Sequence, residues 1–124
     1  MKQIILIIPL LVILIVQEST ASMARRYFYT KVGQRLELDF YETPKKISRF
    51  VNAKNVGQTH VFTVCNGKNK AKCGFWLNTK TKKKVGPPTT YNKKKNLLII
   101  PKVRALDAGT YYVNSYEDLN VYVM

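Results

Sequence analysis

The stretch LIIPKVRALDAGTYYV, residues 98–113, carries the most specific pattern of the chain. Apolar side chains recur at every second position near both of its ends, which is typical of strands with one buried face. Between these ends lies Asp107-Ala108-Gly109, a group of turn-forming residues. The stretch therefore predicts two β-strands joined by a turn.

The rest of the chain continues this alternation. Leu36, Leu38 and Phe40 alternate with mostly polar neighbours. Other short apolar runs lie at residues 60–65, 74–77, 97–100, 110–113 and 119–123. Turn formers separate the runs, at Thr43-Pro44, Asn66-Gly67, Gly86-Pro87-Pro88, Asp107-Ala108-Gly109 and Glu117-Asp118. No stretch keeps apolar residues at helical spacing for three turns, so we expect an all-β antiparallel sandwich or barrel without helices.

A known pattern narrows this choice to a sandwich. Leu98-x-Ile100-x-x-Val103-x-x-x-Asp107-x-Gly109-x-Tyr111-x-Val113 resembles the segment from strand E to strand F of immunoglobulin domains, and Gly33-x-x-Leu36-x-Leu38-x-Phe40 resembles the run into strand B. The resemblance implies an immunoglobulin-like antiparallel β-sandwich. It also implies a tyrosine corner at Asp107, Gly109 and Tyr111, in which the Tyr hydroxyl bonds to the upstream backbone.

The chain departs from this family where the inter-sheet disulfide is expected. The two Cys positions of the family pattern are Phe40 and Val113 here. A bridge between them would close a loop of about 74 residues and stabilise the fold by roughly 4 kcal/mol. Burial of the two apolar side chains would contribute roughly 1.5–3 kcal/mol each. We therefore expect a variable-like domain that lacks this bridge and is less stable than its relatives, with Phe40 and Val113 buried in the core in its place.

The strand that carries the core Trp in this family is harder to place. Trp76 lies far beyond Phe40 in the sequence, so we expect this strand at residues 47–51, with Ile47 or Phe50 in place of the Trp. The two Cys-containing runs then correspond to the strands added in variable-type domains. Trp76 has two interpretations, which are ordinary packing and an aromatic anchor for a partner.

Cys65 and Cys73 are the only cysteines of the chain. An even count in a secreted chain predicts a disulfide, and closing about nine residues is worth roughly 2.5 kcal/mol. The alternative is a metal site with His60 as third ligand, which offers only three candidate ligands.

The N-terminus predicts secretion. Met1-Lys2-Gln3 is a short basic start, residues 4–16 are apolar or Pro, and residues 17–22 are polar or small. Thirteen residues in a helix reach only about 20 Å, which is short of a hydrocarbon core of roughly 30 Å. We therefore expect a signal peptide at 1–22 and one immunoglobulin-like domain at 23–124, secreted to the extracellular space, with no membrane span.

The net charge of +14 favours anionic partners. Ten lysines gather in three clusters: Lys80, Lys82, Lys83 and Lys84; Lys93, Lys94 and Lys95; and Lys68, Lys70 and Lys72. If the three clusters lie on one side of the sandwich they form an anion-binding field. The alternative is a set of solvated loops that keep a β-protein soluble and unpaired.

The sequence offers little for catalysis or cofactor binding. It has one His and no nucleophile motif or glycine-rich phosphate loop. Glu37 and Asp39 share the face opposite Leu36 and Leu38, where solvated carboxylates are expected. We therefore expect no enzyme, no cofactor and no metal.

Three functions remain. The first is a recognition module that binds an extracellular protein, helped by heparan sulfate or another anionic glycan. The second is a cationic host-defence effector that acts on anionic membranes. The third, a nucleic-acid binder, conflicts with the signal peptide.

Overall fold

The computed structural model describes residues 24–86, 88–114 and 117–124. The expected signal peptide at 1–22 lies outside these residues. The described elements are β1 (Ala24–Thr30), β2 (Leu36–Asp39), β3 (Lys46–Ala53), β4 (Val56–Thr63), η1 (Lys70–Lys72), β5 (Trp76–Asn78), β6 (Lys84–Val85), β7 (Thr90–Asn92), β8 (Leu97–Ile100), η2 (Ala105–Asp107), β9 (Gly109–Tyr112) and β10 (Glu117–Val123).

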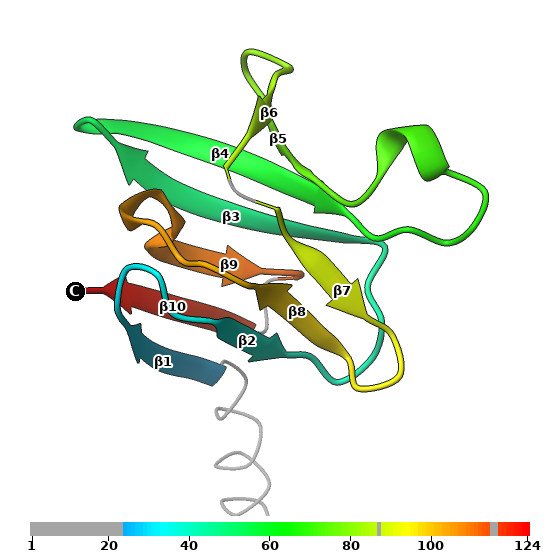
Figure 1. The fold of residues 1–124 in the computed structure, drawn as a ribbon, viewed down its shortest axis with the longest axis horizontal. Helices are drawn as coiled ribbons and strands as arrows, with labels where there is room; N and C mark the ends of the chain where they lie inside the picture. The colour runs from blue at the N-terminus through cyan, green and yellow to red at the C-terminus, as the bar shows by residue number, and fades with distance from the viewer. Residues whose placement is uncertain (1–23, 87, 115–116) are drawn as a thin grey trace, which may run out of the picture.

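The strands form two sheets that stack face to face (Figure 1). The larger sheet has the order β1-β10-β9-β3-β4-β5-β6 and the smaller one the order β2-β8-β7. β1 pairs with β10 in parallel, whereas the other described pairings are antiparallel. In immunoglobulin terms the large sheet is A′GFCC′C″, extended by β6, and the small one is BED. The fold is therefore an immunoglobulin-like β-sandwich of the variable type, as the sequence predicted.

The inward faces of both sheets make one core. β2 alternates strictly between buried and exposed residues, with Leu36 and Leu38 inside. Trp76 lies at the centre, fully buried, with ring centroids 5.4 Å from Phe62 and 5.6 Å from Tyr111. Its indole nitrogen donates a hydrogen bond to Thr89 Oγ1 at 3.0 Å. Ordinary packing is thus the correct interpretation of Trp76, and the partner-anchor interpretation is wrong because no surface of the ring is accessible.

The two residues at the positions of the missing inter-sheet bridge are less buried than expected. Phe40 is only half-buried and packs against Tyr91 at 6.3 Å between ring centroids, while Val113 is 41% exposed. Both residues lie just beyond the ends of their strands, β2 and β9, where the sheets no longer enclose side chains. The prediction that both fill the core was therefore wrong.

The expected strand at 47–51 is present as part of β3. Ile47 is fully buried, as expected of a core position, and Arg49 and Val51 are buried on the same face of this strand. Phe50 is 51% exposed and points to the opposite face, so the alternative assignment to Phe50 is wrong.

Three local predictions also need correction. Glu117-Asp118 was expected to be a turn, but both residues belong to β10 and pair with β1. Two short 3-10 helices, η1 and η2, occur where no helix was expected. β1, β6 and β7 are three further strands that were not predicted from the sequence.

Gly109 is required by a close approach of two strands. β9 pairs with β3, and an added Cβ at Gly109 would lie 2.2 Å from the Phe50 carbonyl oxygen and 2.9 Å from Val51 Cγ1. Any side chain here would push β9 away from β3, so the glycine lets Tyr111 reach the core.

Candidate binding surface

A buried arginine organises the polar centre of the core. Arg49 on β3 is fully buried, and its Nη1 donates hydrogen bonds to Asp107 Oδ1 at 2.8 Å and to the Tyr111 hydroxyl at 3.0 Å. Its Nε donates to His60 Nδ1 at 3.0 Å, and its guanidinium carbon lies 4.0 Å from the centroid of the Trp76 ring. A buried charge needs such partners, because desolvation without them is costly.

The tyrosine-corner residues lie within this network. The Tyr111 hydroxyl donates to the Asp107 carbonyl oxygen at 2.6 Å, which is the geometry implied by the resemblance. The other carboxylate oxygen of Asp107 accepts from the Arg104 amide at 2.8 Å and so closes the turn around η2. Sequence reasoning missed Arg49, although its parity with the inward residues Ile47 and Val51 was a usable signal.

Burial and charge set the protonation of the network. Burial and the neighbouring Arg49 lower the pKa of His60 from 6.5 to about 4. His60 is therefore neutral at physiological pH, accepts from Arg49 at Nδ1 and is paired with Gln58 Oε1 at 2.9 Å through Nε2. Burial raises the pKa of Tyr111 to about 12, so this hydroxyl stays protonated. The network is closed to solvent, so its role is structural.

The two cysteines form a disulfide in the connection between β4 and β5. Cys65 and Cys73 are bonded, with Cα atoms 5.1 Å apart. Because both sulfurs are engaged and His60 lies inside the core, the metal-site alternative is wrong. No group of three potential metal ligands occurs among the residues described.

The carboxylate pair on β2 faces solvent. Asp39 accepts from Arg26 at 2.9 Å, and Glu37 from Arg35 at 3.3 Å. Both carboxylates are more than 40% exposed, Asp39 at 59% and Glu37 at 44%. Such open surface ion pairs are expected to contribute little.

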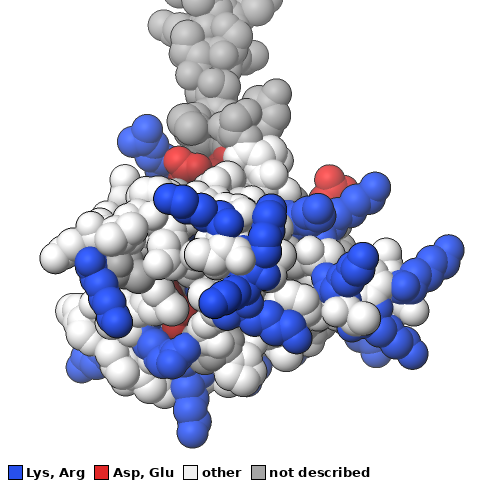
Figure 2. All heavy atoms as spheres, turned by 90° about the horizontal axis from the view of Figure 1, so that it is seen from above, with Lys and Arg blue, Asp and Glu red and all other residues white. Residues whose placement is uncertain are grey.

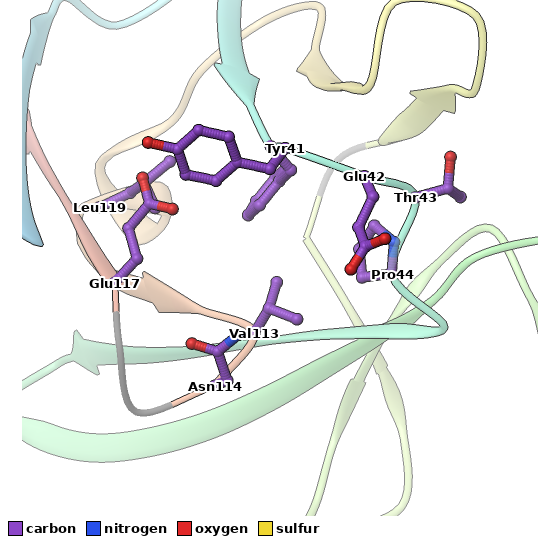
Figure 3. A pocket seen from close by; sticks show the side chains of 9 residues that line it. Tyr41, Glu42, Thr43, Pro44, Val113, Asn114, Glu117 and Leu119 are labelled. Atoms are coloured by element: carbon purple, nitrogen blue, oxygen red, sulfur yellow. The ribbon is translucent and has the colours of Figure 1, made fainter. Parts of the chain in front are cut away.

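A hollow lies beside the positions of the missing inter-sheet bridge. It has a volume of about 210 Å³ and lies between residues 40–44 and the ends of β9 and β10 (Figure 3). Phe40, Val113 and Leu119 line it, and Glu117 at its edge is bound to Arg26 at 2.7 Å.

The outward face of the large sheet carries exposed aromatic rings. Tyr27 and Tyr29 on β1 flank Tyr122 on β10, with near-parallel rings at centroid distances of 6.4 Å and 5.3 Å. All three rings are about half exposed or more. Further along the same face, Phe50 lies over Gly57 and lines a shallow depression with Tyr112 and Thr110. The second sheet covers none of these side chains, because they point away from the core.

A groove continues this face across β4 and β5. It has a volume of about 540 Å³, and Val61, Phe75 and Leu77 supply apolar side chains to it. Three lysines from separate segments also line it: Lys46 at the start of β3, Lys72 in η1 and Lys82 in the β5–β6 turn. Lys84 Nζ lies 4.3 Å from the centroid of the Phe75 ring. We call this site the lysine groove.

The structure thus brings together only part of the expected lysine field. The cluster at 80–84 and the disulfide loop each send one lysine into the lysine groove. Lys93, Lys94 and Lys95 lie in the β7–β8 turn, on the other sheet and away from the β5–β6 turn (Figure 1). Figure 2 shows basic side chains spread over most of the visible face, with few acidic ones.

Comparison with known proteins adds only distant similarities. No protein-family model matches the chain, and no curated protein matches it. One similar solved structure is the extracellular fragment, with its stalk region, of novel immune-type receptor 11 from Ictalurus punctatus, at 13% identity and a TM-score of 0.46, over 80% of this chain and 84% of that one. Another is the extracellular portion of mouse CD200RLa, at 11% identity and a TM-score of 0.43, over 81% of this chain and 56% of that one. Within the described ranges, no helix is long and apolar enough to cross a membrane.

Proposed function

We propose that this chain is a secreted recognition module that binds an acidic extracellular protein through the outward face of its seven-stranded sheet. The observation that carries the proposal is the row of exposed aromatic rings on that face, which includes Tyr27, Tyr29, Tyr122 and Phe50. Aromatic side chains on one continuous face are typical of the centres of protein interfaces, and single exposed rings would not be.

The charge of the face supports an acidic partner. Lys46, Lys72 and Lys82 lie at one side of it, and the chain as a whole carries +14. A partner with carboxylates around an apolar patch would complement both the rings and the lysines. Such complementarity accelerates association and selects against basic partners.

Anionic glycans form the second part of this proposal. Lys80, Lys82, Lys83 and Lys84, together with Lys93, Lys94 and Lys95, are separated over the surface. They therefore suit a long anionic polymer such as heparan sulfate better than a compact ligand. Lysines act as point charges, so this contact should be delocalised and sensitive to salt. It would raise the local concentration of the protein near cells, while the aromatic face would select the partner.

The membrane-effector alternative finds no support in the described residues. Their aromatic side chains lie mainly on strands of the sandwich, and the only helices described are the three-residue η1 and η2. Interfacial membrane binding is typical of amphipathic helices with a basic face, and the described residues contain no helix longer than three residues.

Proximity labelling on cells of the source organism tests the proposal. The secreted protein, fused to a labelling enzyme, is applied with and without excess heparin. We expect a small set of surface proteins to be labelled in both conditions, at a lower level with heparin. Labelling that heparin reduces to background would show that only glycan is bound, and would overturn the proposal of a protein partner.

A further inference from the structure

The lysine groove is built from segments that a disulfide and local hydrogen bonds restrain. The disulfide between Cys65 and Cys73 closes the loop that carries Lys72. Inside this loop Asn69 accepts from the Asn66 amide at 2.9 Å and donates to the Val64 carbonyl at 3.2 Å. The loop is therefore held to the end of β4 by both covalent and hydrogen bonds.

The opposite side of the groove is restrained in a similar way. Asn78 Oδ1 accepts from the amides of Lys80 and Thr81, at 2.9 Å and 3.2 Å. The Lys82 amide donates to the Asn78 carbonyl at 2.9 Å, and Lys82 adopts a positive φ of 62°. A lysine in this backbone region is uncommon, since the conformation favours glycine, asparagine and aspartate. The turn thus keeps the Lys82 backbone next to the groove although its side chain is exposed.

The chemistry of the groove is amphipathic. Val61, Phe75 and Leu77 are only partly buried, so their apolar surface is open to a ligand. Lys46, Lys72 and Lys82 lie around them, and no carboxylate lines the groove. A densely sulfated sugar polymer would pair with the lysines but bury little of this apolar surface. A free anion would leave it exposed.

From this arrangement we propose that the lysine groove binds an acidic peptide segment that inserts an aromatic or aliphatic side chain between its anionic groups. The inserted side chain packs against Val61, Phe75 and Leu77, and flanking carboxylates or a sulfated tyrosine pair with the lysines. This inference rests on the proposed function, because the segment would belong to the acidic partner. The disulfide then acts by holding Lys72 in place before binding, which lowers the entropy lost on association.

Titration calorimetry with three synthetic peptides tests the proposal. They are an acidic dodecapeptide with a central sulfotyrosine, the same peptide with tyrosine, and the same peptide with glycine; a heparin dodecasaccharide is the fourth probe. We expect the sulfotyrosine and tyrosine peptides to bind more tightly than the glycine peptide. Equal binding of all three peptides would show that charge alone acts and would overturn the proposal. Tighter binding of heparin that depends on the same lysines would assign the groove to glycans and would also overturn it.

Matched variants locate the site. Lys72→Ala/Lys82→Ala should weaken the tyrosine peptide by at least about tenfold, whereas Lys93→Ala/Lys95→Ala should change binding by less than about twofold, although both variants lose two charges. Equal losses of peptide affinity in the two variants would contradict a defined binding site. Leu77→Glu, which places a carboxylate among the apolar side chains, should abolish binding; unchanged binding would show that the peptide lies elsewhere.

A disulfide variant tests pre-organisation. Cys65→Ser/Cys73→Ser should still unfold cooperatively, because the bridge lies outside the paired strands, but should bind the tyrosine peptide several-fold more weakly. Unchanged affinity would refute the role given to the disulfide. Binding of the wild-type protein to cells is measured separately. If the protein binds cells but none of the peptides, this inference fails and the proposed function stands; if it does not bind cells, the proposed function fails.

Discussion

Arg49 Nη1 donates to Asp107 Oδ1 at 2.8 Å, and neither side chain has any solvent exposure. This ion pair joins β3 to the turn before β9, so it connects the strand at the centre of the large sheet to the tyrosine corner. In a family member with the inter-sheet disulfide, the covalent bridge spans the same core. Here a hydrogen-bonded charge cluster and the Trp76 ring occupy the centre.

Removal of the Arg49 side-chain charge should lower the free energy of unfolding substantially. Arg49→Met leaves the buried carboxylate of Asp107 without its cation, and we expect a loss of roughly 3–5 kcal/mol in the free energy of unfolding. Arg35→Met is the control, because the Arg35–Glu37 pair is solvent-exposed and should contribute within about 1 kcal/mol. Urea unfolding measures both. Similar small losses would show that the buried pair does not stabilise the core.

Stability should fall as the pH is lowered through the range set by His60. The pKa of His60 is about 4 in the folded chain, whereas in the unfolded chain it has the ordinary value of 6.5. Between these two pH values the unfolded chain therefore binds more protons than the folded one. The contribution of His60 is complete above pH 6.5 and is lost as the pH falls to 4, by roughly 3 kcal/mol. Urea unfolding at pH 7 and pH 4.5 measures it. In His60→Gln the decrease over this window should be smaller, and an unchanged slope would assign it to other groups.

The corner hydroxyl can be tested alone. Tyr111→Phe removes the donor to the Asp107 carbonyl and an acceptor for Arg49, while it keeps the buried ring. We expect a loss of about 1–2 kcal/mol, measured by urea unfolding with the slope unchanged. A loss within experimental error would mean that the two bonds are replaced by water without cost.

A substitution at the strand ends near the missing bridge should cost less stability than a substitution in the core between the sheets. Leu38→Ala opens a cavity at a fully buried position and should cost roughly 2–5 kcal/mol. Val113→Ala acts at a position 41% exposed and should cost less than about 1 kcal/mol. Thermal unfolding of the two variants compares them. A comparable large loss from Val113→Ala would show that this end of the sandwich is closed.

The sequence alone was sufficient to predict those strands that bury one apolar face. β2 and β10 show this alternation, β8 is a continuous apolar run, and the Asp-x-Gly-x-Tyr motif marked the start of β9. β1 was not predicted because its inward side chains include Arg26 and Thr30, and these polar residues do not give the apolar alternation expected of a buried face. β6 has only two residues, too few for a periodic pattern.

The candidate site was less predictable than the fold. The burial of Val113 depends on where β9 ends. Arg49 has the parity of the inward residues Ile47 and Val51, but an arginine is expected in the core only once its partners Asp107 and His60 are placed beside it. The lysine groove combines residues from three separate segments, so only the three-dimensional arrangement reveals which lysines meet.

The most direct test of a recognition face is cell-surface binding by two variants with the same charge change. Tyr29→Glu/Phe50→Glu alters the outward face of the large sheet, and Val32→Glu/Thr90→Glu alters exposed positions on β7 and in the turn before β2. With folding verified by cooperative unfolding, flow cytometry on cells of the source organism should show that the first variant loses most binding at physiological salt. The second should bind within about twofold of the wild type, since surface substitutions away from an interface have small effects. Equal reductions in both variants would show that binding follows net charge alone and would contradict a recognition face on the seven-stranded sheet.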